Sequence, residues 1–311
     1  MGIAEDFDRS FDEAVTEVVA DWPRPRVGTD LISGDAFRAH WATAVQLGWT
    51  SVLDEADFTE PGSEQSRELL DAACGAVTAL ARAGFALPLR QTLVARLASD
   101  KALPADAIAV HPTAHGVWEP VATVRVDVPA PGLPEGTDVA GRPTSAADVT
   151  REGVPDRIHD VAELLLLQEI LGAAEGAATE ARRYVTERVQ YGRPLVKIPA
   201  VRTTVGELNV LLLQLETVVY EARRRFHADD ERALRFALTT AREVASVVAT
   251  EVARITHQLH GAMGITEEAG LHWRTKLLWA DRDEGVFSRY EGLDTLPSAE
   301  EEFWALTGPA W

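Results

Sequence analysis

Apolar residues recur every three or four positions along most of this 311-residue chain, which places them on one face of an α-helix. The N-terminal part predicts four such helices, at about residues 4–19, 33–48, 63–83 and 89–97. Pro23 and Pro25 end the first helix, Ser33 is the expected N-cap of the second, and Gly84 follows the third. We therefore expect an N-terminal helical domain over residues 1–102.

The pattern changes between Leu103 and Pro155. Eight prolines in this segment exclude long helices, because proline cannot donate a backbone hydrogen bond. The residues from Val121 to Val128 alternate between apolar and polar, as in a half-buried strand. We expect a reduced, β-rich middle segment over residues 103–155.

Helical spacing returns at Asp156. It predicts four more helices, at about residues 156–188, 203–226, 230–259 and 271–287. Antiparallel helices joined by short turns bury their apolar stripes against one another, so we expect a four-helix bundle within residues 156–311, followed by an acidic tail. The predicted fold class is therefore mainly α.

Composition narrows the functional classes. The formal charge of −19 argues against nucleic acid as a partner. No apolar run approaches the roughly 18 residues that span a membrane, and the acidic start of the chain does not resemble a signal peptide, so we expect a cytoplasmic protein without membrane contact. Cys74 is the single cysteine, which excludes an internal disulfide; its small neighbours predict core packing.

The first candidate motif is RRYVTERVQYGRPLVKIPAVR, residues 182–202. Gly192 and Pro194 should end the preceding helix within a residue or two of Tyr191, so that Arg188 and Gln190 lie at an abrupt turn. An arginine there can donate two parallel hydrogen bonds to a phosphate. By itself the motif is equally explained by an ion pair of Arg188 with a nearby carboxylate.

The second candidate motif is HQLHGAMGITEE, residues 257–268. Gly261 and Gly264 lie where a long helix must end, and glycine lets a ligand approach the backbone closely. Helix termination alone would also explain these glycines. His257 and His260 have no third ligand at a suitable spacing, so we expect no metal site.

Together the two motifs resemble the acyl-CoA dehydrogenase family, and the LGW sequence at Leu47 is similar to one in its N-terminal domain. In that family an Arg and an aromatic-Gly pair receive the FAD of the adjacent subunit, and a Gln-x-x-Gly-Gly-x-Gly turn holds its adenosine and pyrophosphate. Ala262 stands at the second glycine of that turn. The resemblance implies FAD as cofactor and these cofactor-binding residues: Arg188, Gln190, Tyr191, Gln258, His260, Gly261, Ala262 and Gly264.

The chain also departs from the family. The Gly-Ser-Asp loop and Trp-Ile-Thr strand of the family's β barrel, which binds the flavin ring, do not occur here. Ungapped counting places Gly285 at the usual position of the catalytic glutamate and Ala162 at the alternative one. The two candidate carboxylates are Glu163, beside Ala162, and Glu291, whose Tyr-Glu-Gly sequence resembles that of the family but is displaced by about two helical turns; we expect both to be exposed to solvent. No catalytic base is therefore assigned.

The resemblance thus implies a short, non-catalytic type of subunit in a heteromeric, α2β2 acyl-CoA dehydrogenase that performs α,β-dehydrogenation of an acyl-CoA. A full-length partner subunit would supply the base, the flavin-ring pocket and the site for the acyl-CoA, with steroid side-chain CoA thioesters as the suggested substrate class. Two alternatives stay open. One is an autonomous homo-oligomeric enzyme that uses Glu291 as its base, and the other is a degenerate helical scaffold that binds no flavin.

Overall fold

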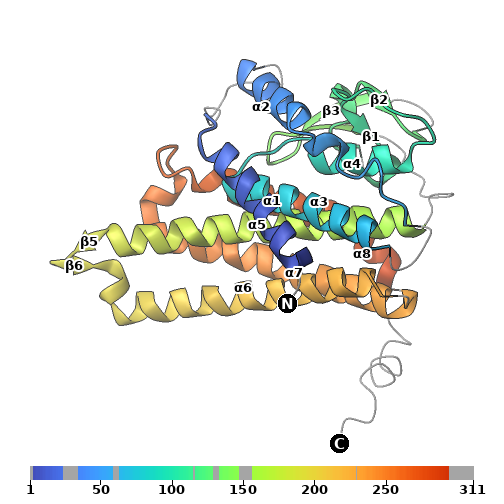
Figure 1. Cartoon of the computed structure of the whole chain (residues 1–311). Helices are drawn as coiled ribbons and strands as arrows, with labels where there is room; N and C mark the ends of the chain where they lie inside the picture. The colour runs from blue at the N-terminus through green and yellow to red at the C-terminus, as the bar shows by residue number, and fades with distance from the viewer. Residues whose placement is uncertain are drawn as a thin grey trace, which may run out of the picture.

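The computed structural model describes residues 3–23, 34–58, 63–114, 116–128, 133–146, 156–228 and 230–293. Its largest part is a bundle of four long antiparallel helices (Figure 1): α5 (Asp156–Glu187), α6 (Pro199–Phe226), α7 (Glu231–His260) and α8 (Leu271–Leu293). The mainly α prediction and the predicted bundle are confirmed. None of the helices in the described ranges is both long and apolar enough to cross a membrane.

Four helices from the N-terminal part precede this bundle; α3 packs against α5, and α1 packs against α3 (Figure 1). They are α1 (Ile3–Ala20), α2 (Asp35–Gln46), α3 (Glu64–Ala83) and α4 (Leu89–Ala98). Ser63 caps α3 by accepting a hydrogen bond from the Ser66 backbone, and Gly84 ends it with a positive φ. The N-cap of α2 is Gly34 and not Ser33, which lies outside the described residues.

Close contact between α3 and α5 depends on small residues. A Cβ added at Gly172 would lie 2.2 Å from the carbonyl oxygen of Thr78, and one added at Gly176 would lie 2.1 Å from that of Arg82. Both distances are far below a van der Waals contact, so only glycine allows the two helix backbones to approach this closely. Cys74 is buried in the same core, as its small neighbours predict.

The middle segment contains little sheet. The two-residue strands β1 (Ala109–Val110) and β2 (Val124–Arg125) pair in parallel, and β3 (Leu133–Thr137) forms an antiparallel hairpin with β4 (Pro143–Ala146). The strand predicted from Val121 to Val128 is therefore reduced to two residues. The reason is local: a 3₁₀ turn occupies Glu119–Val121, and the positive φ of Asp127 interrupts extended backbone on the other side.

Candidate functional site

The first motif forms a short hairpin that projects beyond the bundle (Figure 1). Helix α5 ends at Glu187, earlier than the predicted end near Tyr191. The strands β5 (Val189–Gln190) and β6 (Arg193–Pro194) then pair in antiparallel register. The helix ends early because the residues on both sides of a two-residue hairpin loop must be extended in order to pair.

The loop of this hairpin places an aromatic ring in solvent. Tyr191 and Gly192 are the two loop residues, with φ of 52° and 73°, as a type I′ turn requires. Positive φ is ordinary for glycine but unfavourable for a tyrosine. The Tyr191 side chain is nevertheless 92% exposed, so packing against the described residues does not offset the backbone strain. Such strain is often found at residues that have a function.

Arg188 lies at the base of the hairpin and is exposed. Its backbone is fixed on both sides, because its N–H donates to the Tyr184 carbonyl at 2.8 Å and its carbonyl accepts from Leu195 N–H at 2.9 Å. Its guanidinium has no hydrogen bond or ion pair with any described residue, whereas nearby Arg183 pairs with Glu187 at 2.9 Å. The ion-pair interpretation of Arg188 is thus not supported among the described residues.

The second motif continues α7 into a 3₁₀ turn, Gly261–Ile265. Gly261 has a positive φ, and an added Cβ there would meet no atom within 4 Å. Gly261 and Ala262 are both exposed, so their backbone is open to a ligand. Gly264 differs, because an added Cβ would lie 3.0 Å from His260 Cβ and 3.1 Å from His257 Nδ1. Gly264 therefore allows the turn to fold tightly back on α7.

His260 joins the two motifs. Its ring stacks on Tyr184 of α5 with 4.6 Å between centroids, and its Nδ1 lies 2.8 Å from the Thr256 carbonyl, to which it donates. Burial lowers the pKa of His260, so the ring is neutral near pH 7. Only 4% of the residue is exposed, which suits a packing role. Gln258, two residues earlier, is exposed and accepts a hydrogen bond from Arg254 at 3.1 Å.

The fold thus brings both motifs to the same end of the bundle, where α5 and α7 end (Figure 1). A guanidinium that pairs with none of the described residues, an exposed amide, an exposed ring and an open glycine turn are the groups that would hold a ligand with phosphates and an aromatic base. These residues fit the phosphate end of a dinucleotide. Direct contacts of the eight residues with FAD stay a prediction.

The candidate bases do not behave as expected. The Glu163 side chain is 9% exposed and forms an ion pair with Arg242 of α7, so the expectation that it is exposed to solvent is wrong. Helices α5 and α7 pack face to face there, which removes Glu163 from water. The side chain of Glu291 is outside the described part of the structure, so its exposure stays a prediction. Glu284, beside the expected base position, is buried.

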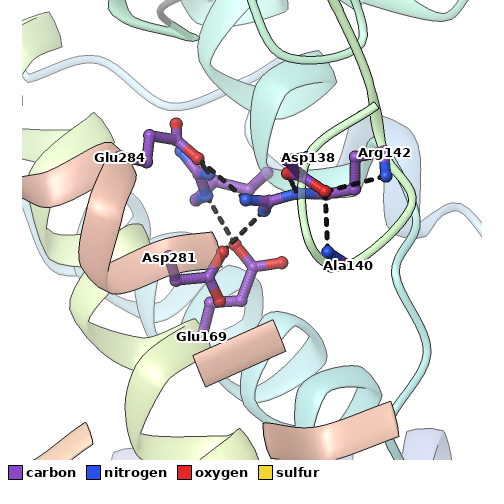
Figure 2. Close-up of polar contacts among 7 residues, drawn as sticks. Asp138, Ala140, Arg142, Glu169, Asp281 and Glu284 are labelled. Carbon is purple, nitrogen blue, oxygen red and sulfur yellow. Dashed lines mark hydrogen bonds and ion pairs between the residues drawn. The ribbon is translucent and has the colours of Figure 1, made fainter. Parts of the chain in front are cut away.

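Glu284 belongs to a feature that the sequence does not reveal, which we call the buried ionic group: Arg90, Arg142, Glu169, Asp281 and Glu284. Arg90 donates to Glu169 and to Glu284, each at 2.7 Å. Arg142 donates to Asp281 at 2.6 Å (Figure 2). Glu284 is 5% exposed and is held by Arg90, so it is not accessible to a substrate and does not replace the missing base.

Comparisons with known proteins agree with these elements. The family profile "Acyl-CoA dehydrogenase, C-terminal domain" matches residues 163–281. Acyl-CoA dehydrogenase IpdE2 of Mycobacterium tuberculosis is 30% identical over 263 residues, which cover 76% of this chain and 79% of that protein.

Two solved structures have the same fold. A chain of the ChsE4-ChsE5 complex from Mycobacterium tuberculosis matches with a TM-score of 0.70 and 17% identity, over 100% of this chain and 99% of that one. A chain of the Tcur3481-Tcur3483 steroid acyl-CoA dehydrogenase matches with a TM-score of 0.71 and 18% identity, over 96% and 99%.

Proposed function

Because this chain belongs to the acyl-CoA dehydrogenase family, we propose that it is the non-catalytic subunit of a heteromeric, FAD-dependent acyl-CoA dehydrogenase. FAD, the cofactor of the family, supplies the acceptor for the hydride that leaves the β-carbon of an acyl-CoA. The observation that carries the proposal is the exposed Arg188, unpaired among the described residues, together with the commitment of both Glu163 and Glu284 to buried ion pairs.

In this proposal the chain holds only the phosphate end of FAD. Arg188 donates two hydrogen bonds to the pyrophosphate, and the open backbone at Gly261 and Ala262 lies against the same group. Gln190, Tyr191 and Gln258 contact the adenosine side. His260 and Gly264 act indirectly, because they fix the turn against α5 and α7.

The partner subunit supplies the remaining chemistry. Removal of the α-proton of a thioester needs a positioned carboxylate, because that proton is only weakly acidic. Glu163 and Glu284 are each committed to a buried ion pair, so neither meets this need. A full-length acyl-CoA dehydrogenase would contribute the base, the flavin-ring pocket and the acyl-CoA site.

The outer face of α6 supports an association with such a partner. Val210, Leu213 and Tyr220 are 56%, 62% and 57% exposed. Their spacing of three and seven residues places them in one line along the helix, the arrangement by which a helix packs against another helix. Isolated exposed apolar residues are common, but a line of them indicates a contact surface. We propose an α2β2 assembly, with steroid side-chain CoA thioesters as substrates, by analogy with the steroid enzyme among the structural matches.

The experiment is to co-express the chain with a full-length acyl-CoA dehydrogenase from the same organism and to measure flavin absorbance per purified complex. Arg188→Ala should lower flavin affinity at least about tenfold, because a hydrogen bond to a charged group contributes about 1.5–3 kcal/mol. Arg183→Ala is the matched control: it removes a neighbouring exposed arginine whose partners are Glu180 and Glu187, and should leave flavin content unchanged.

Two outcomes would contradict the proposal. Flavin retention that does not respond to Arg188→Ala would favour a scaffold that makes no contact with FAD. A chain that purifies alone with bound flavin, and reduces that flavin on addition of an acyl-CoA, would be an autonomous enzyme.

A further inference from the structure

The buried ionic group contains more acids than bases. Its two guanidinium groups face three carboxyl groups, those of Glu169, Asp281 and Glu284, and each of the five residues is at most 5% exposed. If every carboxyl were ionised, the group would have a net charge of −1 out of contact with water. An uncompensated buried charge is strongly unfavourable. The group is therefore electrically neutral only when one carboxyl carries a proton.

Asp281 is the carboxyl that fits this role. It is fully buried, its Oδ1 lies 2.6 Å from Arg142 Nη1, and its Oδ2 has no hydrogen-bond partner among the described residues. Burial, reinforced by the nearby Glu169 carboxylate, raises the pKa of Asp281 well above its usual range. The two arginines oppose this shift but do not cancel it.

Arg142 connects the group to the middle segment. Arg142 is the last residue of the turn between β3 and β4. The Asp138 carboxylate closes this turn: it accepts hydrogen bonds from the backbone N–H groups of Ala140 and Arg142, each at 2.9 Å, and from Arg142 Nε at 2.6 Å. Figure 2 shows the Arg142 guanidinium between this turn and Asp281. One buried side chain thus joins the β3–β4 hairpin to α8.

We propose that the buried ionic group is a proton-dependent latch, in which protonated Asp281 keeps Arg142 and the β3–β4 hairpin docked on the helical bundle, and loss of that proton releases the hairpin. The charged groups around Asp281 come from every element that meets there: Arg90 of α4, Arg142 with Asp138 of the β3–β4 turn, Glu169 of α5 and Glu284 of α8. Asp138 adds to the excess of acid at the edge of the group, where its side chain is 17% exposed.

The direction of the pH effect follows from linkage. A carboxyl that binds its proton more tightly in the docked state stabilises that state at low pH, and the contribution is lost as the pH rises through the raised pKa. Ionised Asp281 is favoured when water reaches it, and opening of the hairpin admits water. The latch therefore opens on the alkaline side.

Hydrogen exchange of the full chain, followed by mass spectrometry and corrected for the intrinsic pH dependence of exchange, tests this. Peptides covering residues 133–146 should lose protection as the pH rises from roughly 6 to 10, while peptides of α7 keep theirs. Asp281→Asn keeps the shape and removes the titration, so protection of the hairpin should become independent of pH.

Glu169→Gln is a second test of the proposal. It removes one negative charge, so the two arginines balance an ionised Asp281 and Glu284. The hairpin should then stay docked whether or not Asp281 carries a proton, and its protection should again be independent of pH. Asp160→Asn is the control, since it alters another partly buried carboxyl on α5 and should leave the hairpin's response as in the parent chain. The latch would be refuted by a parent chain whose hairpin protection does not change with pH, or by an Asp281→Asn or Glu169→Gln chain that responds like the parent.

Discussion

Replacing Tyr191 by asparagine should make the isolated chain more stable and the flavin complex weaker. Tyr191 adopts a φ of 52° in the hairpin loop, and the left-handed region costs an ordinary residue roughly 1–2 kcal/mol. Asparagine is one of the residues that tolerates this region and is favoured in type I′ turns. Since the ring is 92% exposed, its removal sacrifices almost no buried surface.

The expected gain is about 1 kcal/mol, which corresponds to a rise in Tm of about 2 °C for a chain of this size. The effect on the complex has the opposite sign. An aromatic side chain buried at a subunit or ligand contact contributes on the order of 2 kcal/mol, so flavin affinity of the co-expressed complex should fall by roughly 30-fold.

The assays are thermal unfolding of the isolated chain and flavin titration of the complex. Tyr191→Phe is the matched control, because it keeps both the ring and the unfavourable φ; it should change neither quantity appreciably. A lower Tm for Tyr191→Asn would show that the loop strain has been misjudged. A higher Tm with undiminished flavin affinity would show that the strained ring has no part in the contact.

Three further outcomes follow from the fold. Leu213→Lys should leave the unfolding free energy within about 0.5 kcal/mol but weaken association with the partner, measured by light scattering; an intact complex would remove α6 from the interface. Gly172→Ala should lower the free energy of unfolding in urea by about 2–4 kcal/mol, because the added Cβ would clash with the Thr78 carbonyl. Gly206→Ala is the control: its Cβ would lie in open space on α6, so it should raise the free energy of unfolding by up to about 1 kcal/mol. Burial raises the pKa of Asp160 to about 6, so the folded chain binds this proton more tightly than the unfolded chain does. The resulting contribution to the free energy of unfolding is complete below about pH 4 and is lost as the pH rises through 6. Asp160→Asn should therefore flatten the dependence of the unfolding free energy on pH between these values.

The candidate site was predictable in part, because some of its signals are local. Gly192 and Pro194 require a break whatever the rest of the chain does, and Gly261 marks the end of α7 in the same way. The helix period cannot show that the residues before the break form a strand pair. The residues after Arg188 therefore form a hairpin, and Tyr191 lies in its strained loop instead of at a helix end.

The helices and their bundle follow from consecutive residues, through apolar spacing and through glycine and proline. Which charges are buried depends instead on how the helices and the β3–β4 hairpin pack against one another. Glu163 is indistinguishable in the sequence from a surface carboxylate, and Asp281 meets Arg142 across 139 positions. The physical reason is that burial and pairing are properties of the contact between elements, and residues far apart in the chain carry no local signal of the partner they will meet.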